Sequence, residues 1–114
     1  MKKNSDFRRV YSNGKSAAAS ALVVYYRPVK RDFNQVGITV STKVGKAVTR
    51  NLVRRRIREI YRLNERRVKR GLDIVVVARV KSPFVTYRQL ERDFIWACGK
   101  LGILRDRPGE AQKK

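Results

Sequence analysis

Residues 43–70 carry the sequence K-V-G-K-A-V-T-R-N-L-V-R-R-R-I-R-E-I-Y-R-L-N-E-R-R-V-K-R, in which apolar and basic positions alternate with a helical period. A glycine turn at Gly45 precedes the periodic part, and Gly71 stands in the usual position for a helix end. The pattern therefore predicts one long helix that ends near Arg70. At about 100° per residue, the side of this helix that would face a core carries Val53, Ile57, Ile60, Tyr61 and Val68.

The opposite side of the predicted helix is almost purely cationic. Four arginines follow one another at intervals of four residues, and like charges at that spacing destabilise a helix by about 0.2–0.5 kcal/mol per pair. A helix face that only meets water usually mixes the two signs, whereas here only Glu59 and Glu65 interrupt the run. The pattern favours a surface that binds a polyanion over a solvated face. This basic arc contains Asn51, Arg54, Arg55, Arg58, Arg62 and Arg66.

The whole chain is basic, since its 114 residues contain 29 Lys and Arg against 9 Asp and Glu, a net charge of +20. Residues 43–70 hold twelve of these cations and two of the acids, so half of the net charge lies in about a quarter of the chain. Such a concentration is typical of a nucleic-acid-binding surface.

The sequence gives no sign of a membrane or of export. No run approaches the roughly 18 consecutive apolar residues of a spanning helix, and the opening M-K-K-N-S-D-F-R-R lacks the apolar core of a signal peptide. The single cysteine, Cys98, rules out an internal disulfide and suits a reducing compartment. We expect a cytoplasmic protein that makes no membrane contact.

The first part of the chain predicts a short helix followed by β structure. The helix carries Phe7, Val10 and Tyr11 on one side, with Asn4 or Ser5 as its cap and an Asn-Gly pair at its end. A run of small residues then precedes L-V-V-Y-Y-R, which predicts one long strand with a bend in it.

Later segments alternate between strands and helices. Residues 28–34 form a polar connection of hairpin length, and residues 35–42 alternate like a strand with core on one face and polar groups on the other. Residues 72–80 are continuously apolar, which indicates a strand buried on both faces. Residues 86–101 begin with the capping box Thr-x-x-Gln and continue as a helix that buries Cys98.

The order of these elements predicts an α+β fold. It is α-β-β-(β)-α-β-α, in which the bracketed strand is optional, and such an order gives a two-layer sandwich of helices on a small mixed sheet. Residues 1–104 are expected to form a single RNA-binding domain. Residues 105–114 lack an apolar pattern and are expected to be a basic, disordered tail.

The chain offers little for catalysis by its own side chains. It contains no histidine, its carboxylates are scattered, and it has no glycine-rich phosphate loop. Cys98 lies on an apolar stripe, which favours a core thiol over a nucleophile. We expect no catalytic and no metal-ligating residue here. Aromatic rings suited to stacking on unpaired bases are present instead, although Phe7 and Tyr11 would equally suit a core, and the adjacent Tyr25 and Tyr26 must point to opposite sheet faces.

The basic stretch strongly resembles the signature of the bacterial ribonuclease P protein component, in which a Lys precedes Gly-x-Ala-Val-x-Arg-Asn-Arg-x-Lys-Arg-x-x-Arg. The similarity covers most of the chain, from the opening D-F-R-R-V-Y to the closing helix. One departure is Leu52 at the second Arg of Arg-Asn-Arg, so a contact of that guanidinium is expected to be absent or moved to Arg56. The matching residues are Lys43, Gly45, Ala47, Val48, Arg50, Asn51, Arg55 and Arg58, with Arg54 at the Lys position.

The resemblance implies a fold and a function. The fold is one in which a strand, the basic helix and the buried strand form a left-handed βαβ crossover, as in domain 2 of certain ribosomal proteins and against the usual right-handed preference. The function is that of the small subunit of a ribonucleoprotein endonuclease that removes 5′ leaders from precursor tRNA. Catalysis and its Mg²⁺ ions would belong to the large RNA, with no cofactor held by the protein alone and no obligate protein partner.

The resemblance also implies two sets of site residues. The RNA-facing set contains Lys43, Lys46, Arg50, Asn51, Arg54, Arg55, Arg58 and Arg62. The leader-binding cleft, between the first helix and the sheet, contains Phe7, Tyr11 and Tyr25. Two other functions stay open, a ribosomal or chaperone-like RNA-binding protein with no part in cleavage and, more remotely, a protein nuclease. Cleavage of precursor tRNA by the chain alone, or only after the large RNA is added, separates these possibilities.

Overall fold

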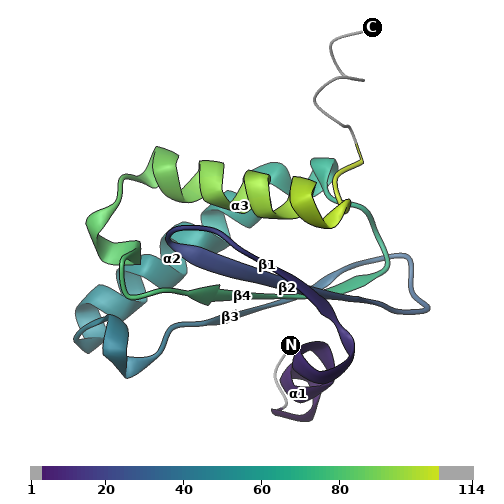
Figure 1. The fold of residues 1–114 in the computed structure, drawn as a ribbon, viewed down its shortest axis with the longest axis horizontal. Coiled ribbons are helices and arrows are strands. Elements are labelled where there is room, and N and C mark those ends of the chain that lie inside the picture. Colours follow the sequence, from purple (N-terminus) through teal and green to yellow (C-terminus); the bar gives the residue numbers. More distant parts are fainter. Residues whose placement is uncertain (1–3, 106–114) are drawn as a thin grey trace, which may run out of the picture.

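The computed structural model describes residues 4–105 and contains one mixed four-stranded sheet with three helices. The strands lie in the order β1-β2-β4-β3, with β4 antiparallel to β2 and parallel to β3. Helices α2 and α3 cover one face of the sheet and α1 lies on the other (Figure 1). This confirms the α+β class. The elements are α1 (Asn4–Asn13), β1 (Lys15–Ala18), β2 (Leu22–Pro28), β3 (Gln35–Thr39), α2 (Ala47–Asn64), β4 (Leu72–Ala78) and α3 (Tyr87–Leu101).

Strand β4 is buried on both faces, as its continuous apolar sequence predicts. Ile74 and Val76 belong to the core on the side of α2 and α3, while the fully buried Val75 points to the side of α1. The acidic Asp73 is also buried, and it is paired there with the guanidinium of Arg31. Because β4 hydrogen-bonds to β2 on one edge and β3 on the other, it is the centre of the whole sheet.

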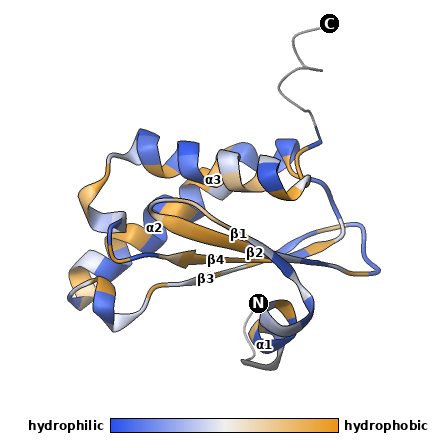
Figure 2. Cartoon of the chain, viewed as in Figure 1, coloured by the Kyte–Doolittle hydropathy of each residue, from blue (hydrophilic) through white to orange (hydrophobic). Residues whose placement is uncertain are grey.

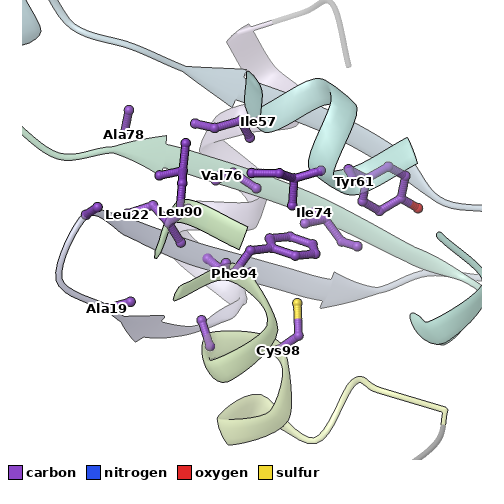
Figure 3. Packing of buried hydrophobic residues seen from close by; sticks show 14 of the residues in the cluster. Ala19, Leu22, Ile57, Tyr61, Ile74, Val76, Ala78, Leu90, Phe94 and Cys98 are labelled. Carbon is purple, nitrogen blue, oxygen red and sulfur yellow. The ribbon is translucent and has the colours of Figure 1, made fainter. Parts of the chain in front are cut away.

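The main core lies between the sheet and the two helices α2 and α3 (Figure 3). Ile57 comes from α2, Leu90 and Phe94 from α3, and Leu22 from β2, and each of them is essentially inaccessible to solvent. The ring of Tyr61 meets Phe94 edge to face, with centroids 6.3 Å apart. Figure 2 shows the same division, with hydrophobic residues on the strands and hydrophilic ones on the outer sides of the helices.

The predicted long strand with a bend is in fact a hairpin of β1 and β2. The run of small residues forms its turn, which closes with a hydrogen bond from the Ala19 N–H to the Leu22 carbonyl at 2.8 Å. Two other backbone groups of the turn bind side chains from distant elements: the Ala21 N–H donates to Asp93 Oδ2 at 2.8 Å, and Arg79 Nη1 donates to the Ala19 carbonyl at 2.9 Å. The prediction was wrong because these partners lie far away in the sequence.

Helix α2 ends at Asn64, six residues before the predicted end. The Asn64 side chain is buried and donates to the Ile60 carbonyl at 2.8 Å and to Glu91 Oε2 at 2.9 Å. After a short 3-10 turn, Val68 is extended and pairs with Leu104 in an isolated bridge. Val68 is therefore buried as predicted, but from an extended segment and not from the helix.

Gly71 directly precedes β4 and does not end α2. It has a φ of +81°, and a Cβ at this position would lie 2.6 Å from the Arg31 carbonyl oxygen. Both the backbone conformation and the close approach require glycine here.

Residues 29–34 have the length of a hairpin loop but join two strands that are not neighbours, since β4 lies between β2 and β3. Asn34 fixes the end of this loop. Its Oδ1 accepts from the Leu72 N–H at 2.9 Å, and its Nδ2 donates to the Lys69 carbonyl at 2.8 Å and to the Tyr61 hydroxyl at 3.1 Å. The chain thereby crosses the end of β4 and enters β3 parallel to it.

The closing helix α3 has the predicted boundaries. Thr86 and Gln89 form the reciprocal capping box, with hydrogen bonds of 2.9 and 3.1 Å, and Gly102 ends the helix in the left-handed conformation. Cys98 is buried in the core, as its position on the apolar stripe predicts.

Residues 1–3 and 106–114, at the two ends of the chain, are not among the described residues. The side chains of Asn4 and Ser5, predicted to cap α1, are not described, and the predicted disordered tail falls outside the described residues except for Arg105. The Arg105 N–H donates to the Arg67 carbonyl at 2.6 Å. None of the helices within residues 4–105 is long and apolar enough to cross a membrane.

Neighbouring residues of α2 should respond differently to truncation. Ile57→Ala should destabilise the fold by about 2–5 kcal/mol, because the side chain is buried and its removal leaves a cavity. Arg58→Ala removes an exposed cation from a run of like charges and should change stability little or raise it slightly. Urea unfolding of both variants tests this, and equal destabilisation would show that the two faces of the helix are wrongly assigned.

Candidate nucleic-acid interface

The first turn of α2 is arranged to attract anions. A 3-10 turn at Thr42–Val44 leads into it, anchored by the buried Val44, and Lys43 and Lys46 on either side are exposed. The first turn contains no acidic side chain, and no side chain caps it, so its backbone N–H groups keep their positive potential. The half-buried Arg50 reaches back and donates to the Gly45 carbonyl at 3.2 Å, which ties the helix to the preceding loop.

The middle of α2 presents the basic arc to solvent. Asn51 Oδ1 accepts a hydrogen bond from Arg54 Nη1 at 3.1 Å and so orients that guanidinium. Arg55 and Arg58 are exposed, and within residues 4–105 neither has a hydrogen bond or an ion pair. Their charges are available to an external anion.

Arg62, at the far end of the arc, differs from the others because Glu59 partly neutralises it. The two side chains form a bidentate pair with distances of 2.7 and 3.1 Å, and both are exposed. The hydrogen bond from Arg62 lowers the pKa of the Glu59 carboxyl below its usual value. Arg62 is therefore less available to an anion than Arg55 or Arg58.

A groove of about 240 Å³ runs along the free edge of β3, where the two faces of the sheet meet. Phe7 reaches it from α1 on one face, and Arg54 and Arg58 reach it from α2 on the other. The groove therefore joins an aromatic ring to two guanidiniums that lie more than forty residues away in the chain. The remaining lining residues are Val36, Gly37, Ile38 and Tyr61.

The other aromatic residues of the predicted cleft lie on the α1 face of the sheet. Tyr11 and Tyr25 meet edge to face with centroids 4.9 Å apart, and the Tyr11 hydroxyl lies 3.3 Å from Thr39 Oγ1. Val10, which is completely buried, anchors α1, whereas the Tyr11 side chain is 39% exposed. Tyr26 packs against the main core on the opposite face, as the alternation along β2 predicts.

Thr39, beside Tyr11, and Ile38, in the groove, are two residues of the candidate interface that the sequence did not predict. The only signal for Thr39 was the alternation of residues 35–42, which placed a polar face on this strand. Leu52 is half-buried and lines a second hollow with the exposed Val48 and three arginines of the arc. Arg56 follows Leu52 by one helical turn.

Within residues 4–105, no group of three or more His, Cys, Asp or Glu side chains is placed to hold a metal ion. Burial raises the pKa of the Cys98 thiol to about 12, so this sulfur is protonated at neutral pH.

These features define a class: a small basic α+β protein whose crossover helix turns a cationic face outward beside an aromatic groove. A model of the ribonuclease P family matches residues 1–102, and the chain belongs to that family. Members of it are components of a ribonucleoprotein that processes tRNA as an endoribonuclease. The resemblance seen in the basic stretch is thus confirmed.

Relatives and solved structures agree with this assignment. The ribonuclease P protein component of Clostridioides difficile (strain 630) is 53% identical over 93 residues, which cover 81% of this chain and 82% of the relative. That of Alkaliphilus oremlandii is 41% identical over 104 residues, 91% of each chain. The structure of the Staphylococcus aureus RNase P protein matches with a TM-score of 0.80 at 36% identity, covering 90% of this chain and 93% of that one. The Thermotoga maritima protein matches with a TM-score of 0.77 at 32% identity, covering 83% and 90%.

Removing one cation from the arc should change the salt dependence of RNA binding. Each phosphate neutralised contributes about −0.7 to −0.9 to the slope of log affinity against log salt. Arg54→Ala or Arg58→Ala should therefore reduce the magnitude of the slope by about one such step. Lys30→Ala, which removes the same charge from an exposed loop outside the arc, is the control. Titrations over a range of salt concentrations measure the slope, and slopes unchanged in both arginine variants would make the arc a solvated surface.

Proposed function

We propose that this chain is the protein subunit of ribonuclease P, which binds the catalytic RNA through the basic arc. The 5′ leader of precursor tRNA would bind through the groove and through the Tyr11–Tyr25 pair, which lies on the same face of the sheet as Phe7. The observation that carries the proposal is the groove along β3, where Phe7 meets Arg54 and Arg58. A single-stranded leader offers unpaired bases to aromatic rings and phosphates to guanidiniums at the same time. Folded RNA hides its bases and is met through its backbone, which suits the arc itself.

Hydrolysis, together with the Mg²⁺ that it uses, is assigned in this proposal to the RNA subunit. This division is supported by a chain that contains no histidine and scatters its carboxylates. The contribution of the protein is positional: it neutralises phosphates of the catalytic RNA and holds the leader. The chain alone is therefore expected not to cleave precursor tRNA, and to assist cleavage only together with the large RNA.

Loss of an aromatic ring should weaken binding of the leader and nothing else. Tyr25→Ala should weaken holoenzyme binding of precursor tRNA by about 1–3 kcal/mol, the contribution of one stacked base, and leave binding of mature tRNA nearly unchanged. Tyr11→Ala is the companion variant. Because the Tyr11 ring is more exposed, its removal should perturb the fold less. Arg54→Ala should weaken assembly with the catalytic RNA as well as leader binding, because Arg54 belongs to both the arc and the groove. Affinities for substrates with and without a leader measure the first effect, and affinity for the RNA subunit measures the second.

Two results would contradict the proposal. The first is an equal loss of affinity for both substrates in Tyr25→Ala and Tyr11→Ala, with the fold intact by thermal unfolding. The second is cleavage of precursor tRNA by the chain without the RNA subunit. Binding of RNA without any effect on leader removal by the reconstituted enzyme would favour a ribosomal or chaperone-like role.

A further inference from the structure

Helix α3 has a second cationic surface that the proposed function does not use. Its exposed side chains are Arg88, Gln89, Arg92, Trp96 and Lys100. Four of these follow one another at intervals of four residues, so they form one stripe along the outer side of the helix. Every charged group on this stripe is positive. We refer to Arg88, Arg92, Trp96 and Lys100 as the α3 stripe.

The acidic residues of α3 form no ion pair with the stripe, because both are held by hydrogen bonds to other elements, although each also lines a hollow beside Trp96. Glu91 Oε2 accepts from Asn64 Nδ2 at 2.9 Å, and Asp93 Oδ2 accepts from the Ala21 N–H at 2.8 Å. Within residues 4–105, Arg88 and Arg92 have neither a hydrogen bond nor an ion pair. Two like charges one turn apart, with no ion pair to the acids of the same helix, favour an external anion.

Trp96 adds an aromatic surface between these charges. Its side chain is 52% exposed, although burial of an indole ring is strongly favourable. Hollows adjoin it on both sides. One is lined by Arg88, Glu91 and Arg92 among others, and the other by small residues of the β1–β2 turn together with Arg92 and Asp93. Lys100 Nζ lies 6.0 Å from the ring centroid, at the outer limit of a cation–π contact. The ring is thus open to a planar ligand, with a cation on either side of it.

The α3 stripe is separate from the leader groove. Helix α3 lies on the face of the sheet opposite to α1 (Figure 1), and the groove residue Phe7 belongs to α1. The groove lies at the β3 edge of the sheet, whereas α3 packs over β1 and β2 towards the other edge, and the groove and the stripe share no lining residue.

We propose that the α3 stripe is a second RNA-binding surface that takes an unpaired segment, with one base on the Trp96 ring and its flanking phosphates on Arg88, Arg92 and Lys100. Open aromatic rings between cations suit single-stranded nucleic acid, whose bases are free to stack and whose phosphates are regularly spaced. The charge of the stripe argues against an apolar protein partner. The segment could belong to the catalytic RNA or to the precursor, which offer the same chemistry.

Trp96 can serve as the fluorescent probe of its own binding surface, because it is the only tryptophan in the chain. Titration of the full chain with an oligouridylate of about 12 nucleotides should quench its fluorescence in a saturable way, since a stacked base quenches an indole. Excitation at the red edge of the absorption band avoids the tyrosines. The quenching should persist in Tyr25→Ala and in Arg54→Ala, so that failure of the leader groove and failure of the α3 stripe are distinguished.

Variants of the stripe give the second measurement. Arg88→Ala together with Arg92→Ala should shift the quenching midpoint to higher oligonucleotide concentration by at least about fivefold. Trp96→Ala removes the fluorophore, so its effect is measured by filter retention in the Tyr25→Ala background. There it should weaken oligonucleotide binding about 5- to 150-fold. Lys15→Ala together with Lys30→Ala removes the same charge from exposed positions outside the stripe and should have a smaller effect. Thermal unfolding of each variant verifies the fold.

The reconstituted holoenzyme identifies the source of the segment. Quenching of Trp96 on addition of the catalytic RNA alone assigns it to that RNA, and quenching only after precursor tRNA is added assigns it to the substrate. Unchanged Trp96 fluorescence in the oligonucleotide titration and in both holoenzyme arms overturns the proposal and leaves this face to a protein partner. The proposal is also overturned if the Lys15→Ala and Lys30→Ala pair shifts the quenching midpoint as much as the Arg88→Ala and Arg92→Ala pair. The net charge of the protein, and not a defined site, would then account for binding.

Discussion

The double burial of β4 is the constraint on which the rest of the molecule depends. A strand whose side chains are apolar on both faces must be covered on both, and it needs a hydrogen-bonding neighbour on each edge. Strands β2 and β3 supply the neighbours, α2 and α3 cover Ile74 and Val76, and α1 covers Val75. The only acid in this strand, Asp73, is held by Arg31. Each helix is therefore fixed in place by the surface of β4 that it shields.

This constraint also determines where the charge is displayed. Once Val53, Ile57 and Ile60 are buried against the sheet, the helical period directs Arg54 and Arg58 away from the core. Because β3 is an edge strand, these guanidiniums reach the rim of the sheet and meet a ring that arrives from the opposite face. The candidate interface is thus a product of strand order as much as of the basic sequence.

The features that the sequence predicted correctly depend on contacts between residues close to one another in the chain. The capping box at Thr86 and the apolar side of α2 depend on residues within a few positions of one another, so their patterns suffice. The hairpin turn of β1 and β2 and the end of α2 depend on Asp93 and Leu104, which lie far along the chain. The meeting of Phe7 with the basic arc depends on strand order in the same way. Period and spacing carry no information on such contacts, which explains why the turn and the helix end were predicted wrongly.

The position of β3 at the edge of the sheet has a consequence for self-association. An edge strand is where a second strand of matching length can add to a sheet, and proteins commonly guard such edges with charge. Here Arg54 and Arg58 flank the edge in a chain of net charge +20, so two copies that approach edge to edge repel each other. A bound polyanion neutralises these charges and so removes the repulsion. For the protein–RNA complex to resist strand-mediated aggregation, the bound RNA must then cover the edge of β3.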